Sequence, residues 1–195
     1  MATVPVHALT RSQAARRERV VRTAMELAAE GGYEAVQMRD VAARAHVALG
    51  TIYRYFSSKD HLLAEGLVSW SGDLQEKLER NPPTKETTAG RLEEVLRTAT
   101  GNLEKAASLG VAMVTAITGS DPSVTECQQA VSEVMVSILS MALMTVEPEL
   151  RQDIIDVMLH VWYSSLLGWV NGWRNVSSVG DELVKAAHLL CRGVD

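Results

Sequence analysis

Residues 31–63 have the sequence GGYEAVQMRDVAARAHVALGTIYRYFSSKDHLL, and the helical pattern in this segment indicates the fold. Within it, apolar side chains recur at helical spacing over residues 37–45 and again over residues 49–56, with a three-residue break between them. A longer amphipathic helix is predicted before them over residues 12–30, ending at Gly31 and Gly32, because glycine readily adopts the positive φ of a helix C-cap. A supporting helix followed by two short helices and a tight turn predicts a three-helix helix-turn-helix unit.

The rest of the chain has the same three- and four-residue spacing of apolar side chains, which predicts an all-α fold of about nine helices. A long helix over residues 58–80 is expected to follow the helix-turn-helix unit, with a capping box of Ser57 and Asp60 at its start. Ser178 and Asp181 are expected to cap the last helix in the same way. The other predicted helices cover residues 87–107, 108–118, 123–146, 148–174 and 179–192.

The net charge is −5 over 195 residues, but the charge is unevenly distributed. Residues 1–22 contain five arginines and one glutamate, and residues 37–59 contain four basic side chains and one aspartate. Residues 66–195 contain ten basic and seventeen acidic side chains. This asymmetry favours phosphate contacts near the N-terminus and disfavours them elsewhere.

Several classes of protein are disfavoured by what the sequence lacks. No uncharged apolar run is long enough to span a bilayer, and the first twenty residues have no apolar leader, so we expect a soluble cytoplasmic protein without a membrane partner. Cys127 and Cys191 are the only cysteines, and the five histidines lack ligand spacing, so neither a metal nor a cofactor is expected. GxSxG, HExxH, Walker A and GxGxxG motifs are absent, which predicts no enzymatic activity.

Residues 31–63 resemble the DNA-binding domain of TetR-family transcriptional regulators, which has Gly-Tyr, Gly-Thr-Ile-Tyr and Ser-Lys-x-x-Leu elements in this order. The sequence departs from the family pattern at Gln37, where a capping Thr is common, and at His46, where Gly ends the first helix of the motif. It also departs at Ala48 and Leu49, where Ser often opens the recognition helix. Residues 31–63 and 156–169 are more specifically similar to the KstR-type repressors of sterol catabolism in actinobacteria.

This resemblance implies a repressor that binds a double-stranded, palindromic DNA operator as a homodimer and is released by a small apolar effector, such as a sterol-derived CoA thioester. The implied domains are a flexible arm (1–11), a helix-turn-helix DNA-binding domain (12–57), a connecting helix (58–80) and an effector-binding and dimerisation domain (81–195). An effector packed against Leu67, Trp70 or Leu74 would tilt the connecting helix and weaken operator binding.

The expected site residues form three groups. In the DNA-binding group, Gln37, Leu49, Gly50 and Thr51 are expected nearest the bases, and the others are expected mainly to contact phosphates. The whole group is Arg16, Arg17, Gln37, Met38, Arg39, Ala48, Leu49, Gly50, Thr51, Tyr53, Arg54, Tyr55 and Lys59. The expected walls of the effector pocket are Leu67, Trp70, Leu74, Met113, Ile117, Met135, Leu139, Trp162 and Leu166. The expected dimer interface, including two of three indoles placed on one face of the helix over residues 148–174, is Trp169, Trp173, Leu183, Ala187 and Leu190.

The same sequence features are compatible with other functions. A TetR-type regulator of efflux or fatty-acid metabolism would have the same fold and respond to drugs or acyl-CoA. An activator would use the same helix-turn-helix unit as a repressor. A non-specific DNA-binding helical protein would share the basic N-terminal segment, but it would not need the long acidic, apolar-striped remainder.

Overall fold

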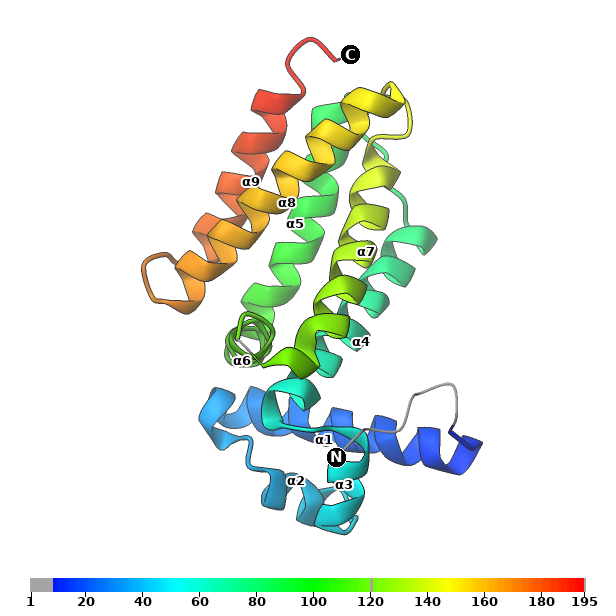
Figure 1. The fold of residues 1–195 in the computed structure, drawn as a ribbon. Coiled ribbons are helices and arrows are strands. Elements are labelled where there is room, and N and C mark those ends of the chain that lie inside the picture. The colour runs from blue at the N-terminus through cyan, green and yellow to red at the C-terminus, as the bar shows by residue number, and fades with distance from the viewer. Residues whose placement is uncertain (1–8, 120, 195) are drawn as a thin grey trace. The chain divides into compact units, whose positions relative to one another are not determined.

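The computed structural model describes residues 9–119 and 121–194, so most of the expected arm lies outside the described residues. Every regular element in these residues is a helix, which confirms the predicted fold class (Figure 1). The elements are α1 (Arg11–Ala35), α2 (Met38–Arg44), α3 (Leu49–Tyr55), α4 (Lys59–Arg80), α5 (Thr88–Lys105), α6 (Ala107–Ile117), the 3-10 helix η2 (Pro122–Val124), α7 (Thr125–Ala142), α8 (Pro148–Val170) and α9 (Val176–Leu190). No helix among the described residues is both long and apolar enough to cross a lipid bilayer.

The chain forms two compact units. Unit 1 comprises Met1–Ser69 and Ala106–Gln129, and unit 2 comprises Trp70–Lys105 and Ala130–Asp195. This division differs from the domain boundaries expected from the sequence, because α6 packs against α1 in unit 1 although it follows α5 in the chain.

Unit 1 is built on the apolar stripe of α1. Val20, Ala24 and Ala28 are fully buried, as are Ile52 and Phe56 at the end of the helix-turn-helix segment. At the start of α1, the Thr10 and Gln13 side chains form a capping box with each other's backbone N–H groups. Near its end, the regular helix is interrupted as the sequence predicts.

Two glycines cause this interruption of α1. Gly31 has a φ of −145° and Gly32 a φ of 72°, and a final helical turn then continues to Ala35. The positive φ at Gly32 is a conformation that side chains with a Cβ rarely adopt. The chain can therefore turn there and enter α2.

Two predicted caps are wrong by a few residues. At the start of α4 the backbone N–H of His61 donates to Ser58 Oγ over 3.0 Å, so Ser58 is the capping residue instead of Ser57. The α9 helix begins after Asn175, and Ser178 donates its hydroxyl to the Asn175 carbonyl over 2.7 Å. A neighbouring serine therefore caps α4, whereas the Asn175 side chain makes no capping hydrogen bond at the start of α9. Sequence spacing alone does not distinguish these cases.

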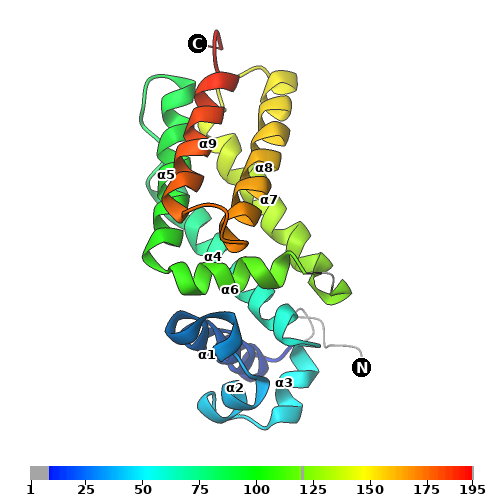
Figure 2. The same cartoon turned by 90° about the vertical axis from the view of Figure 1, so that its left-hand side faces the viewer.

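In unit 2, α9 packs against both α5 and α8 (Figure 2). The close approach of α9 to α5 requires glycine at position 180, since a Cβ there would lie 2.9 Å from Thr100 Oγ1. A polar contact borders this seam, in which Arg97 Nη1 lies 2.7 Å from Asp181 Oδ1. The inner face of α9 is therefore part of the core of unit 2.

The predicted face of three indoles does not form. Trp162 and Trp169 are 9% and 8% exposed, whereas Trp173 is 78% exposed. The α8 helix ends at Val170, and Gly172 has a φ of 74° in the turn that follows. Because Trp173 lies beyond the helix, the helical spacing that grouped it with the other two no longer applies.

Candidate nucleic-acid interface

The turn between α2 and α3 is fixed to the supporting helix. Arg19 of α1 donates its Nε–H to the Ala45 carbonyl over 3.0 Å. His46 then adopts a φ of 52° and is the one described non-glycine residue with a positive φ. It occupies the position where the sequence departs from the expected glycine, so histidine here adopts the left-handed conformation that glycine would adopt more easily.

The α3 helix has one buried and one exposed face. Ile52, Tyr55 and Phe56, at its end, are 0%, 3% and 0% exposed and belong to the core of unit 1. The exposed face contains Ala48, Gly50, Tyr53 and Arg54, and Leu49 and Thr51 are partly exposed beside it. This face combines small residues, which allow close approach of the backbone, with hydrogen-bonding side chains.

Tyr55 was expected to reach a phosphate, and the structure corrects that expectation. Its ring is buried and packs edge-on against Phe56 with a centroid distance of 6.2 Å. Tyr53 is 43% exposed. Residues two apart on a helix point in different directions, so only one of the two tyrosines can face outward.

Neither short helix has a side-chain N-cap. Gln37 precedes α2 and Ala48 precedes α3, and neither side chain accepts a hydrogen bond from the helix it precedes. The Gln37 amide donates instead to the Glu34 carbonyl over 3.0 Å. The substitutions noted at these positions in the sequence therefore leave the first N–H groups of both helices without a side-chain acceptor.

Some basic residues of the predicted DNA-binding group are already engaged within the protein. Arg17 is ion-paired with Glu65, and its guanidinium lies 5.0 Å from the centroid of the Phe56 ring. The Lys59 ammonium lies 3.6 Å from the centroid of the Tyr33 ring and donates to the Tyr33 carbonyl over 3.3 Å. These two side chains hold α1 against α3 and α4 in unit 1.

Other basic residues of the group are available. Arg16, Arg39 and Arg54 form no hydrogen bond or ion pair within residues 9–119 and 121–194. Arg39 and Arg54 are exposed, and Arg16 is partly exposed. Met38, the remaining member of the predicted group, is partly buried at the start of α2. The unpaired guanidinium groups are the ones placed to contact an external anion.

The structure also brings together three potential metal ligands that sequence spacing did not group. His61, Glu65 and Cys127 have donor atoms within 4.8 Å of one another, because the start of α7 places Cys127 beside α4. His61 Nδ1 accepts from the Ser57 backbone N–H over 3.2 Å, and Nε2 lies 3.7 Å from Glu65 Oε1. Imidazole and carboxylate are thus engaged within the protein.

The ionisation of this cluster is consistent with a structural role. Burial raises the pKa of Glu65, but hydrogen bonds from His61 and Arg17 lower it more, so the net pKa lies below its usual range. Burial raises the pKa of the Cys127 thiol to about 12, so the thiol remains protonated at neutral pH. Glu65 is thus already paired within the protein, and the Cys127 thiol is not a nucleophilic thiolate at neutral pH.

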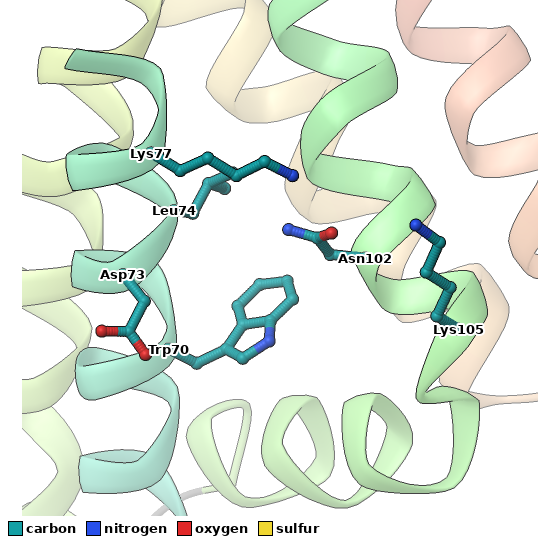
Figure 3. A pocket seen from close by; sticks show the side chains of 6 residues that line it. All are labelled: Trp70, Asp73, Leu74, Lys77, Asn102 and Lys105. Carbon is teal, nitrogen blue, oxygen red and sulfur yellow. The ribbon is translucent and has the colours of Figure 1, made fainter. Parts of the chain in front are cut away.

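Two of the predicted pocket walls lie at a groove in unit 2, and the others lie in the interior of the two units. Only Trp70 and Leu74 line the groove of about 330 Å³ in unit 2, whose other lining residues are Asp73, Lys77, Asn102 and Lys105 (Figure 3). The remaining predicted walls are buried or half-buried core residues: Leu67, Met113 and Ile117 in unit 1, and Met135, Leu139, Trp162 and Leu166 in unit 2. Apolar residues at helical spacing can belong to a core or to a pocket wall, so the assignment of these interior residues as pocket walls stays a prediction.

The predicted dimer residues are likewise mostly interior. Leu183 and Ala187 have no exposed surface, Trp169 is nearly buried and Leu190 is half-buried. Their helix faces pack within unit 2, so they have little surface left for a second chain. The exposed large apolar side chains of α8 and α9 include Val157, Tyr163 and Leu189, with Trp173 in the turn between the helices.

The sequence matches two protein families that together cover most of the chain. Residues 20–65 match the bacterial regulatory proteins of the tetR family, and residues 86–190 match the tetracyclin repressor-like C-terminal domain. The chain belongs to the TetR family. This TetR-family regulator is 35% identical over 180 residues to the HTH-type transcriptional repressor KstR of Mycobacterium tuberculosis, covering 92% of this chain and 82% of that protein.

Other relatives agree with this assignment. The KstR repressor of Rhodococcus jostii is 34% identical over 180 residues, covering 92% of this chain and 84% of the relative. Among solved structures, a TetR transcriptional regulator from Rhodococcus sp. RHA1 superposes with a TM-score of 0.77 and 26% identity, covering 94% of this chain and 100% of the other. Thermus thermophilus FadR in complex with lauroyl-CoA shares the fold, with a TM-score of 0.71, 20% identity and coverage of 92% and 95%.

Proposed function

We propose that this TetR-family regulator is a cytoplasmic repressor that binds a palindromic operator as a homodimer and is released by an effector of the acyl-CoA type, most specifically a sterol-derived CoA thioester. The observation that carries the DNA-binding part is the exposed face of α3, where small residues lie beside Thr51, Tyr53 and Arg54. The similarity to KstR repressors over 92% of the chain supports repression as its regulatory effect.

The proposed DNA contacts divide into two kinds. Leu49, Gly50 and Thr51 at the start of α3 lie nearest the base edges, and Gln37 approaches them from the start of α2. Arg16, Arg39 and Arg54 contact phosphates, which orient the protein without reading sequence. Arg17 and Lys59 contribute by holding the helix-turn-helix segment together, since their charged groups are engaged within unit 1.

A homodimer follows from the small size of one helix-turn-helix unit. Two copies related by a two-fold axis would read half-sites one helical turn or more apart. The exposed Val157, Tyr163 and Leu189 side chains, with Trp173, are the proposed apolar surface for the second copy. Their apolar area would otherwise remain in contact with water.

The effector is proposed to act through α4, which contributes residues to both units. A ligand that prefers the released conformation by about 1–3 kcal/mol would lower operator affinity about 5–150-fold. The acyl-CoA class is supported by the similarity to KstR repressors, and FadR proteins that bind lauroyl-CoA or stearoyl-CoA share the fold. A drug-responsive regulator is the competing possibility.

The proposal is tested by selecting bound fragments from a random DNA library and footprinting the enriched sequence. A protected palindrome that is released by a sterol-derived CoA ester is the expected result. Uniform protection without enrichment would contradict sequence-specific binding. Release by cationic dyes alone would refute the acyl-CoA class, and release by fatty acyl-CoA alone would replace the sterol-derived effector with a fatty-acid one.

A further inference from the structure

The groove in unit 2 has a mixed lining, and an apolar effector does not explain its polar part. It lies between α4, which contributes Trp70, Leu74 and Lys77, and α5, which contributes Asn102 and Lys105. Its volume of about 330 Å³ is near the lower end of the range of about 300–1,000 Å³ for small-molecule sites. The groove therefore suits one compact chemical group rather than a complete acyl-CoA.

Three lining side chains carry amino or amide donors: the exposed Lys77 and Lys105 and the partly exposed Asn102. Figure 3 shows Lys77 extending from α4 toward α5, Asn102 extending back toward α4, and the Trp70 indole lying below them. Neither ammonium group nor the Asn102 amide has a hydrogen-bond or ion-pair partner within the described residues. The one acidic lining residue is Asp73, whose carboxylate lies along α4, away from Lys105 (Figure 3).

These groups together recognise a definable class of ligand. Two ammonium groups and an amide without acceptors favour an anion, and their charge matches a phosphate monoester, which carries about −1.5 to −2 at pH 7. The partly exposed indole of Trp70 offers a flat apolar surface on which a heteroaromatic ring can stack. We propose that this groove binds a nucleotide, with the ring against Trp70 and a phosphate between Lys77 and Lys105.

This proposal deepens the proposed function and rests on it in one respect. Coenzyme A ends in a phosphorylated adenine nucleotide, so with a CoA thioester as effector the groove would bind the nucleotide end and leave the acyl group to a different part of the protein. Nucleotide binding itself requires neither DNA nor an acyl group. The two proposals can therefore fail separately.

The test is isothermal titration of the full chain with adenosine 3′,5′-bisphosphate, with adenosine and inorganic phosphate as the ring-only and charge-only probes. The bisphosphate is expected to bind more tightly than either part. Lys77→Gln and Lys105→Gln should each weaken it about tenfold or more, because each removes a charged hydrogen-bond donor. Trp70→Leu should weaken both the bisphosphate and adenosine, whereas Lys185→Gln, an exposed lysine of α9 outside the groove, should leave affinity unchanged.

Three results would overturn the proposal: no detectable binding of the bisphosphate, affinity unchanged in the groove variants, or equal binding of inorganic phosphate alone. Thermal unfolding of each variant confirms that it folds. Operator affinity measured without nucleotide should be unchanged by the groove substitutions. A wild-type chain that binds the nucleotide but selects no operator would refute the proposed function and leave the groove assignment standing.

Discussion

The guanidinium of Arg17 is ion-paired with the carboxylate of Glu65, which joins α1 to α4 inside unit 1. Both side chains are mostly buried, with 15% and 21% of their surfaces exposed. An arginine in the basic N-terminal segment thus supports the helix-turn-helix segment from behind, while Arg54 remains unpaired on its outer face. Arg17 therefore has a structural role, whereas Arg54 is available to contact DNA.

Replacing Glu65 by Gln should destabilise the protein by about 2 kcal/mol at neutral pH, because the charged hydrogen bonds to Arg17 and His61 are lost. The pKa of Glu65 lies below its ordinary value of 4.5, so the carboxylate stabilises the fold above that value and loses this effect as the pH falls below it. Urea unfolding of the wild type and of Glu65→Gln, at pH values above and below 4.5, measures the difference between their free energies of unfolding. Glu26→Gln, at a carboxylate that is 48% exposed, is the control and should change stability by about 0–1 kcal/mol. A difference that grows as the pH falls would contradict the account.

The unpaired Arg54 should contribute to phosphate binding and the paired Arg44 should contribute less. Arg44 lies in the same segment but is ion-paired with Glu30, whereas Arg54 has no partner in the described residues. Arg54→Ala should lower affinity for all DNA sequences and reduce the slope of log affinity against log salt by about 1. Fluorescence anisotropy at several salt concentrations gives the slope for the wild type and for Arg54→Ala. Equal slopes for wild type and Arg54→Ala would remove Arg54 from the phosphate contacts.

Serine at position 48 should stabilise the recognition helix. Ala48 precedes α3 in an extended conformation and its side chain accepts no hydrogen bond. A serine hydroxyl there would accept from a free N–H at the helix start, which typically contributes about 1 kcal/mol. Chemical unfolding without DNA measures the gain. Ala43→Ser, an exposed position inside α2, should give no such gain, and equal effects at both positions would argue against capping.

Alanine at position 180 should destabilise unit 2. A Cβ there would lie 2.9 Å from Thr100 Oγ1 and 3.3 Å from Arg97 Nη1, and Thr100 is buried and cannot move aside. Overpacking of this kind costs about 1–3 kcal/mol. Gly101→Ala is the matched control, because a Cβ at that helical glycine meets no atom within 4 Å and should stabilise α5 by about 0.5–1 kcal/mol. Thermal unfolding that ranks the two variants in the opposite order would contradict this packing.

The helical elements and the helix-turn-helix order could be predicted from the sequence because they depend on local spacing. The glycine pair that interrupts α1 and the missing caps at Gln37 and Ala48 are also local features, and the structure has them. Helix ends that depend on tertiary contacts are harder to predict from the sequence. The end of α8 before Trp173 falls within a stretch whose apolar spacing continues past it.

The site was less predictable because residues distant in the sequence determine which of its side chains are already engaged within the protein. Arg17 is paired with Glu65 and Tyr55 is buried against Phe56, and neither partner is indicated by the local sequence pattern. The groove residues Lys77 and Lys105 come from two helices whose polar positions look like ordinary solvated faces in the sequence. Periodicity identifies which side chains are apolar, but it does not show which polar side chains meet across a groove.

The claim that the outer face of α3 reads DNA bases is tested most directly by measuring dissociation constants for a panel of operators, each with one base pair changed. Wild type, Leu49→Ala and Thr51→Ala are compared across the panel. At least one variant should lose about 1–3 kcal/mol of discrimination at a single position in each half-site and keep it elsewhere. Unchanged discrimination at every position in both variants would show that the outer face of α3 does not read the bases.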